Sequence, residues 1–584
     1  MSAGNFASRR QNFYIIRASA APVMTLLEIL RAEAGSELQR LLVVANAAAL
    51  ASALSLAIIN SAAGSTGPVE LLDLGLLGLV VAAYCLCSRH VERRLAVLME
   101  SALNRIKLRV AKRVIRVELD RLEQVRAAEI CDRITENTSF ISERISMLAA
   151  MVQSITTLIF LSIYIGYMST PALALLLLLI GISTGLFMTM RREFVVAIRT
   201  TGRLRMRFFE RLSDLLAGFK QLKFNRLATR ELHADIVADS SALRHAGVRS
   251  SKLMADNMVL SNGIAFALLA AVAFALQQYV ALDRGTLAAL IAAAMFLRAP
   301  VFVISLAMLP YVRANVCLAE IAALEQRLEQ AGRDGLADLE PVDPWSDQGS
   351  DQGSDQGSDR GGSPRSLVAR GLEYTYPARQ GEPGFHVGPV DLSFAAGEVV
   401  FIVGGNGSGK STLLKTLIGL YPASGGTIEL DGVAVDDDKR VAYRERICAI
   451  FSDFHLFDAL YGLGEVSDER VAELITQMEL DGITSCTAGQ FSRLDLSTGQ
   501  RKRLAMVVAL LEDRPICVFD EWPADQDPSF RRYFYDELIV QLRAAGKLII
   551  VVSHDDRYFD RADRVITMEY GTVRSSAGIQ EDAR

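Results

Sequence analysis

The chain has 584 residues, a formal net charge of −5 and 51% hydrophobic residues. It is too long for a single core, because domains usually have about 100–200 residues, and we expect at least two domains. The long apolar runs all lie before about residue 315, and the basic residues fall in the loops between them. A nucleic-acid partner is therefore excluded, because it would require a concentrated basic surface.

The first forty residues carry dense charges and only short apolar runs. A secretory signal needs a longer apolar centre, so we expect residues 1–40 to form a cytoplasmic N-terminal segment. We also expect no peptidase domain ahead of the first long apolar run. The seven cysteines form no matching pair of CxxC motifs, and we interpret them as reduced packing residues.

Six apolar runs are long enough to cross a bilayer, which takes about 20 residues per helix. They lie near residues 41–63, 71–88, 146–167, 171–190, 257–280 and 286–310. The loops after the first and third runs contain no Lys or Arg, whereas residues 89–145 and 191–256 are rich in both. Since positive charge stays in the cytoplasm, these two long segments, the N-terminus and the C-terminal part are predicted to lie inside.

The two long inner segments are charged but favour helix, with apolar residues at helical spacing and no alternation typical of strands. We predict that the membrane helices continue through them far into the cytoplasm. Loosely ordered loops are the alternative.

A four-residue repeat, SDQGSDQGSDQGSDRG, occupies residues 346–361 and contains no apolar side chain. Nothing in it can offset the entropy of ordering, so we predict a flexible linker over residues 331–365. The linker would separate a transmembrane domain, residues 41–330, from a second domain, residues 366–584.

The second domain begins with a buried-strand run, EVVFIVG, followed by GGNGSGKSTLLKTLIG. This matches the GxxxxGK[ST] pattern of a phosphate-binding loop, and it has the strand and helix that such a loop requires. Gly404, Gly407 and Gly409 would let the backbone wrap a polyphosphate. Lys410 would supply a charge to the outer phosphates, and Ser411 a hydroxyl to Mg²⁺.

Two further strand-like runs end in polar residues that would lie at the same edge of a parallel sheet. ICVFDE ends in Asp520 and Glu521, and KLIIVVSHDD presents His554. Asp520 suits a metal's surroundings, and Glu521 would orient and deprotonate the attacking water. His554 would contact the γ-phosphate, although a lone histidine is more often structural.

Between these motifs lies LSTGQRKRLAM, a polar turn that opens a basic helix at Ser497. An ordinary helix N-cap explains the pattern equally well.

Taken together, these motifs resemble those of the ABC transporter superfamily, whose ATPase domains carry a phosphate loop, an LSGGQ-type signature, a DE pair, a D-loop and a switch histidine in this order. In that family the signature of one ATPase domain closes over the phosphate loop of its partner, which implies a homodimer here. The resemblance further implies that Tyr376 stacks on adenine and that Asp527 is the D-loop acid. It places coupling helices near Val117–Arg126 and Leu216–Thr229.

Besides Tyr376 and Asp527, the resemblance implies two groups of nucleotide-binding residues, with Ser452 between them in the sequence. The first group binds phosphates and Mg²⁺: Gly404, Gly405, Asn406, Gly407, Ser408, Gly409, Lys410, Ser411 and Thr412, with Asp520 at the metal. The second contacts ATP on the partner copy: Ser497, Thr498, Gly499 and Gln500. Ser452 stands between them where most members of the superfamily have Gln, and it is too short to repeat the direct contact of Gln with Mg²⁺.

The strings FSDFHLFD, LSTGQRKRLA, DEWPADQDPSFRRYFY and SHDDRYF resemble those of bacterial exporters of cyclic or modified peptides and siderophore-peptide precursors, typified by the syringomycin and pyoverdine exporters. Thr498 and Ser452 fit this group but depart from the superfamily, and Pro523 stands where Ala is expected.

The expected fold is an all-α six-helix transmembrane domain of the exporter type plus an α/β P-loop nucleotide-binding domain with a helical subdomain. The resemblance implies ATP-driven export of a peptide or siderophore-like cargo across the bacterial inner membrane, with ATP and Mg²⁺ bound and with membrane lipids around the spans. The alternatives are lipid or multidrug export and siderophore import through the same fold. A soluble ABC ATPase is excluded by the six spans.

Arg298 lies about twelve residues into the last span. A charge at that depth is costly and usually faces a polar cavity, so we expect it to hold an anionic part of the cargo. A salt bridge or a carbonyl partner on another helix is the alternative.

Overall fold

A computed structural model describes residues 26–64, 71–123, 127–279, 283–331, 365–377, 384–464 and 466–578. These residues form two compact units, which we describe separately. The membrane unit combines residues from 1–111 and 126–327, and the ATPase unit combines residues from 112–125 and 328–584. The predicted flexible linker lies outside the described residues, apart from its two ends.

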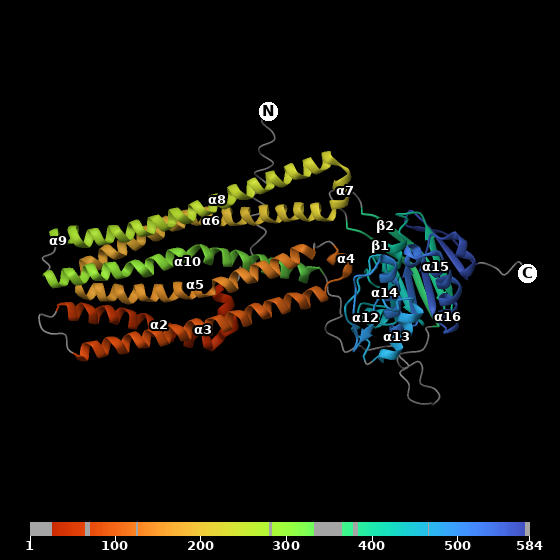
Figure 1. The fold of residues 1–584 in the computed structure, drawn as a ribbon, viewed down its shortest axis with the longest axis horizontal. Helices are drawn as coiled ribbons and strands as arrows, with labels where there is room; N and C mark the ends of the chain where they lie inside the picture. Colours follow the sequence, from red (N-terminus) through yellow and green to blue (C-terminus); the bar gives the residue numbers. More distant parts are fainter. Residues whose placement is uncertain are drawn as a thin grey trace, which may run out of the picture. The chain divides into compact units, whose positions relative to one another are not determined.

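The membrane unit is built from long helices that run roughly parallel to one another (Figure 1). They are α2 (Leu26–Gly64), α3 (Leu71–Ile115), α5 (Ala127–Met168), α6 (Thr170–Ala217), α8 (Arg226–Ala270) with the π-helical turn η1 (Ala271–Ala275) and α9 (Leu276–Tyr279), and α10 (Arg284–Gln330). The described residues contain six helices long and apolar enough to span a membrane, as predicted. Within α2, the backbone of Gly35 is not helical, and the candidate span begins after it at Glu37.

These helices are much longer than a bilayer requires. At about 1.5 Å per residue, the 45 residues of α3 extend about 68 Å, whereas the apolar core of a bilayer is about 30 Å thick. The prediction that the spans continue as helices beyond the membrane is therefore confirmed, and the alternative of loosely ordered loops is wrong. α6 and α8 lie side by side and are joined by the short helix α7 (Phe219–Phe224) (Figure 1).

Polar side chains hold the helices of this unit together at defined depths. Asn60 of α2 donates to the Tyr164 hydroxyl at 3.2 Å and to the Ala289 carbonyl at 3.3 Å, so it joins α2 to α5 and α10. In the charged extensions, buried Asp239 of α8 pairs with Arg207 and Arg211 of α6. Such contacts fix the register of helices whose remaining contacts are apolar and unspecific.

The ATPase unit contains two main sheets. A six-stranded sheet has the order β12-β11-β3-β10-β9-β6, with all neighbours parallel except β12 and β11. Its strands are β3 (Val399–Gly404), β6 (Ile447–Ile450), β9 (Ile516–Asp520), β10 (Leu548–Val552), β11 (Arg564–Glu569) and β12 (Thr572–Gly578). A four-stranded antiparallel sheet has the order β2-β1-β4-β5, from β1 (Ser366–Thr375), β2 (His386–Ala395), β4 (Gly425–Leu430) and β5 (Val433–Ala434).

Helices cover the parallel sheet and fill the connections between strands (Figure 1). They are α11 (Lys410–Leu417), α12 (Arg440–Arg444), α13 (Asp468–Gln477), α14 (Thr498–Glu512), α15 (Pro528–Tyr533), the π-helical turn η5 (Phe534–Leu538) and α16 (Ile539–Ala544). A two-stranded ribbon pairs β7 (Cys486–Thr487) with β8 (Gln490–Phe491). The short helix α4 (Leu119–Leu122) belongs to this unit although it lies early in the chain.

Alternation along the central strands divides the core into two layers. On β3, Val399 and Phe401 face a cluster that contains Phe519, Trp522 and the helices α13 to α16. Val400 and Ile402 face the opposite cluster, which includes α11 and the antiparallel sheet. A strand buried on both faces reads as a continuous apolar run, which explains why EVVFIVG predicted it.

Phe401 is expected to be a major contributor to this core. It is fully buried, and its ring lies 5.8 Å from that of Tyr535 and 6.4 Å from that of Phe559. Replacing it with Ala is expected to lower the free energy of unfolding by about 3–5 kcal/mol, because a cavity would remain. Calorimetry of the purified full chain measures this, with exposed Val540→Ala as the control, for which a change within about 0.5 kcal/mol is expected. Equal losses in the two variants would contradict the prediction.

Candidate functional site

The phosphate loop connects β3 to α11, as the motif predicts. Gly404 and Gly409 have φ values of +150° and +100°, and a Cβ at Gly404 would lie 2.3 Å from the Met568 carbonyl oxygen. No other residue type fits there without moving the backbone. The Lys410 ammonium donates to the carbonyls of Gly404 and Gly405 at 3.1 and 3.0 Å and so folds back over the loop.

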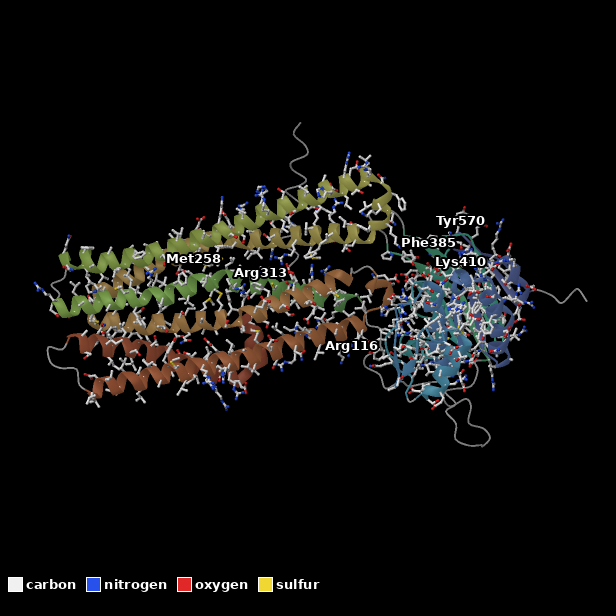
Figure 2. The ribbon with its side chains drawn as sticks, viewed as in Figure 1. Arg116, Met258, Arg313, Phe385, Lys410 and Tyr570 are labelled. Carbon is white, nitrogen blue, oxygen red and sulfur yellow. The ribbon has the colours of Figure 1, made fainter. Side chains whose placement is uncertain are left out.

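Aromatic residues border this loop on two sides. Figure 2 shows Phe385, Lys410 and Tyr570 close together in the ATPase unit, and a Cβ at Gly409 would lie 3.4 Å from the Phe385 ring. Tyr376, predicted to stack on adenine, is half-buried, and its hydroxyl lies 3.3 Å from that of Thr412. The predicted adenine-binding residue and the phosphate loop are thus neighbours.

Asp520 ends β9 in a buried position beside the loop. Burial raises the pKa of its carboxyl, while a hydrogen bond from Ser411 and the charge of Lys410 act in the opposite direction. Its Oδ1 is buried and has no hydrogen-bond partner in the described part of the chain. An acceptor oxygen of this kind, next to a serine hydroxyl, fits a divalent cation that prefers oxygen ligands.

Glu521 and His554 meet at the end of the neighbouring strands. β9 and β10 are parallel, with Asp520 opposite Val552, so the residues that follow both strands emerge together. The distance from His554 Nε2 to Glu521 Oε1 is 3.0 Å. Burial lowers the pKa of Lys410, while the charges of Glu521 and Asp520 act in the opposite direction. The residues predicted from three separate motifs therefore form one cluster.

The signature segment forms the N-terminus of α14. The Ser497 hydroxyl caps α14 and accepts a hydrogen bond from the main-chain amide of Gln500 at 3.3 Å, and the main-chain amide of Ser497 donates to Gln500 Oε1 at 3.0 Å. The N-cap geometry considered for the sequence is therefore present. The described chain shows no hydrogen bond between Ser497, Thr498, Gly499 or Gln500 and its own phosphate loop.

Asp527 and Ser452, which were also predicted to bind nucleotide, lie at the start of α15 and in the turn after β6. Asp527 caps α15 and accepts from the Phe530 amide at 3.0 Å, and it pairs with Arg503; hydrogen bonds, first from Ser529, lower its pKa. Ser452 is exposed in the turn after β6. Neither residue contacts the phosphate loop through a hydrogen bond in the residues described.

Arg298 lies exposed on α10, with its guanidinium carbon 5.2 Å from the centre of the Phe266 ring on α8. The salt bridge and the carbonyl partner considered as alternatives do not occur among the described residues. A cation–π contact therefore orients this side chain.

Residues 118–123 dock on the ATPase domain through side-chain contacts that the sequence did not predict. Glu123 accepts from the Tyr421 hydroxyl at 2.6 Å and from Lys415 at 2.9 Å, and Glu118 pairs with Arg440 at 3.1 Å. Tyr374 donates to Asp120 at 3.2 Å. This segment is most of the first predicted coupling region, of which residues 124–126 lie outside the described part. α7 occupies the second predicted region.

Comparisons with known proteins agree with this geometry. The ABC transporter family model matches residues 387–524. The "ATP-binding protein SyrD" of Pseudomonas syringae pv. syringae is 30% identical over 489 residues, which is 81% of this chain and 82% of that protein. An "ATP-dependent lipid A-core flippase" of Burkholderia thailandensis is 32% identical over 207 residues, 33% of this chain and 34% of the flippase.

A solved structure, that of a bacterial Atm1-family ABC exporter with ATP bound, matches with a TM-score of 0.70 at 18% identity. The match covers 94% of this chain and 95% of that one, and it confirms the predicted fold. Fold and site together define a membrane exporter that couples ATP hydrolysis to transport.

The chain belongs to the ABC transporter family. It is a multi-pass inner-membrane protein whose ATPase domain lies in the cytoplasm.

The burial of the Asp520 carboxyl predicts an effect on thermal stability. Because its pKa is raised, the folded protein disfavours the ionised form, so stability is lost as the pH rises through that pKa. Asp520→Asn is therefore expected to raise the melting temperature of the nucleotide-free protein at neutral pH by a few degrees, as about 1 kcal/mol gives about 2–4 °C. The gain should shrink at mildly acidic pH. Thermal unfolding measures this, with exposed Asp495→Asn as the unchanged control, and a less stable Asp520→Asn at neutral pH would refute it.

Proposed function

We propose that this transporter exports a modified or cyclic peptide, or a siderophore-peptide precursor, across the inner membrane as a homodimer. The carrying observation is the similarity to SyrD, whose 489 matched residues extend far beyond the ATPase domain into the membrane-spanning half. The four sequence strings that resemble peptide and siderophore-peptide exporters support the same cargo class.

The division of the ATP site supports the proposed homodimer. Each chain has one phosphate loop and one signature segment, and among the described residues Ser497 and Gln500 at the N-terminus of α14 bond to each other in a capping box and not to the phosphate loop. In the proposed dimer, Ser497, Thr498, Gly499 and Gln500 of one copy contact the phosphates held by Gly404–Thr412 of the other. Helix N-termini favour anions, so the end of α14 suits this role.

For hydrolysis, Glu521 accepts a proton from the water that attacks the γ-phosphate, and His554, 3.0 Å away, orients its carboxylate. Ser411 and Asp520 would hold Mg²⁺, which when bound neutralises charge on the phosphates. Tyr376 would support the adenine and Asp527 would face the partner. Ser452 stands where a longer side chain would reach the metal, so we assign it no direct contact.

Long helices transmit the change. Binding of two ATP molecules joins the ATPase domains, the helical extensions of α3, α5, α6, α8 and α10 move with them, and the cavity between the spans opens outward. Hydrolysis separates the domains and resets the cavity. Residues 118–123, which dock on the ATPase domain, are the first point at which this movement enters the membrane helices.

The role of Glu521 predicts a defined phenotype for Glu521→Gln. The amide keeps the size of the side chain but cannot accept the proton, so ATP should bind normally while turnover falls by about 10²–10⁴-fold. The bound nucleotide should hold the two copies in a closed dimer, which chemical cross-linking detects. A normal hydrolysis rate in this variant would refute the assignment of the base.

The cargo is tested in inside-out vesicles that contain the purified transporter. With ATP and Mg²⁺ present, they should accumulate a cyclic lipopeptide or a siderophore-peptide precursor, and vesicles with Glu521→Gln should not. Accumulation of lipid alone, or movement of a metal–siderophore complex in the opposite direction, would replace this proposal by the lipid-exporter or importer alternative. The partial similarity to lipid A-core flippases makes the lipid arm informative.

Arg298 is proposed to contact an anionic part of the cargo. Arg298→Ala is expected to lower ATP-dependent accumulation of an anionic peptide while protein yield and basal ATP hydrolysis stay unchanged, because the residue is exposed and lies far from the ATPase motifs in sequence. Arg298→Lys keeps the charge and should retain most of the transport. Unchanged accumulation by the Ala variant would remove the cargo role.

A further inference from the structure

Lys502 is a buried lysine of α14 that the predicted ATP site does not use. Its side chain is only 4% exposed. The ammonium donates to the main-chain carbonyl of Glu521 at 2.9 Å and pairs with Asp525 Oδ2 at 2.7 Å. The Lys502 carbonyl in turn accepts from the indole nitrogen of Trp522, which is fully buried, at 2.9 Å. Lys502 of the signature helix thus contacts Glu521 and also Trp522 and Asp525, which follow Glu521 in the chain.

Lys502 is part of a whole helix face that binds this segment. Gly499, three residues before it, accepts from the Gln526 side chain at 3.1 Å, and a Cβ at Gly499 would lie 3.1 Å from the Asp525 carbonyl oxygen. Arg503 donates to Gln526 at 3.0 Å. Positions three and four apart share one face of a helix, so α14 and residues 521–527 should move together.

The contact also fixes an unusual backbone. Glu521 has a φ of 52°, the left-handed region that residues other than Gly rarely adopt and that costs about 1–2 kcal/mol. Its amide donates to the Val552 carbonyl at 3.1 Å, and its carbonyl accepts from Lys502. Strand β10 therefore holds the amide of Glu521, and the signature helix holds its carbonyl.

A lysine is a costly way to fill a buried position. An apolar side chain would pack there without the loss of hydration that a buried ammonium suffers. The ammonium, however, supplies several donors on a long chain and can reach the Glu521 carbonyl and the Asp525 carboxylate at once. The arrangement therefore ties α14 to the main chain of Glu521 through a direct hydrogen bond, which packing alone would not provide.

We propose that Lys502 is a positioning residue that makes the placement of Glu521 depend on whether the N-terminus of α14 has engaged ATP on the second copy. The inference rests on the proposed function, in which Ser497 and Gln500 contact the partner's nucleotide and Glu521 is the base. When the signature segment binds phosphates, α14 shifts, and Lys502 carries the carbonyl of Glu521 with it. Each copy then hydrolyses its own ATP efficiently only when the other site is occupied.

The test is steady-state ATP hydrolysis by the full-length transporter in proteoliposomes, measured over a range of ATP concentrations. The wild type should show a Hill coefficient above 1. Lys502→Met keeps the length of the side chain but removes the ammonium. It is expected to lower kcat by about 10–100-fold, the usual effect of a small misplacement of a catalytic group. The Hill coefficient should fall to about 1, while half-saturation changes by less than about twofold.

A matched control exists in the same domain. Lys547 is also buried, and its ammonium contacts Asp513 and the Arg514 carbonyl, both at 2.7 Å. It precedes β10, whereas Val552, the neighbour of Glu521, ends that strand about 16 Å away. Lys547→Met should lower thermal stability but leave the Hill coefficient at the wild-type value. A fall in cooperativity in both variants would mean that loss of any buried lysine has this effect, and it would overturn the proposal.

The remaining outcomes are decided by two further variants. If Lys502→Met does not fold, Asp525→Ala removes the half-exposed partner of the pair and should lower kcat and the Hill coefficient in the same direction. Wild-type cooperativity in every folded variant, or a Hill coefficient of about 1 in the wild type, overturns the role of Lys502. Glu521→Gln separates this result from the proposed function, because only hydrolysis by that variant at the wild-type rate would remove Glu521 as the base.

Discussion

The parallel pairing of β9 with β10, and of β10 with β3, is the constraint on which the ATP site depends. Three segments that lie far apart in the chain end at one edge of the sheet because their strands point the same way. Lys410, Asp520, Glu521 and His554 are polar, and their charges or hydrogen-bonding groups would be costly in an apolar core. At the strand ends Lys410 and Asp520 are buried beside the phosphate loop, whereas Glu521 and His554 are partly exposed. The apolar strands thus position the polar residues of the ATP site, although their own side chains are not part of that site.

Much of this could be predicted from the sequence, because the motifs are local. A strand, a glycine-rich loop and a helix follow one another within about twenty residues around Lys410, and each leaves its own pattern. The six spans and their helical extensions were predictable for the same reason, since length and helical spacing can be read from consecutive residues. The 3.0 Å contact between Glu521 and His554 depends on strand register and is seen only in the structure.

Other features could not be predicted, because they depend on pairs distant in sequence. Nothing around Lys502 indicates that its ammonium reaches the carbonyl of Glu521, and a charged residue in LSTGQRKRLAM would ordinarily be placed on an exposed helix face. The aromatic contact of Arg298 with Phe266 was missed, because the sequence suggested an anionic group of the cargo, with a salt bridge or a carbonyl partner as the alternative. In both cases the charged residue could be recognised in the sequence, but its partner could be identified only from the fold.

Glu118, Asp120 and Glu123 precede the first strand of the ATPase domain by more than two hundred residues, yet they complete its surface. A polypeptide cut to begin at Ser366 would retain every nucleotide motif but lose these three acids. Lys415 and Arg440 would then lack their partners from this segment, and the hydroxyls of Tyr374 and Tyr421 would lose their acceptors. The smallest unit that keeps these contacts is therefore discontinuous in sequence, and an excised ATPase domain would differ from the native one at the surface that residues 118–123 cover.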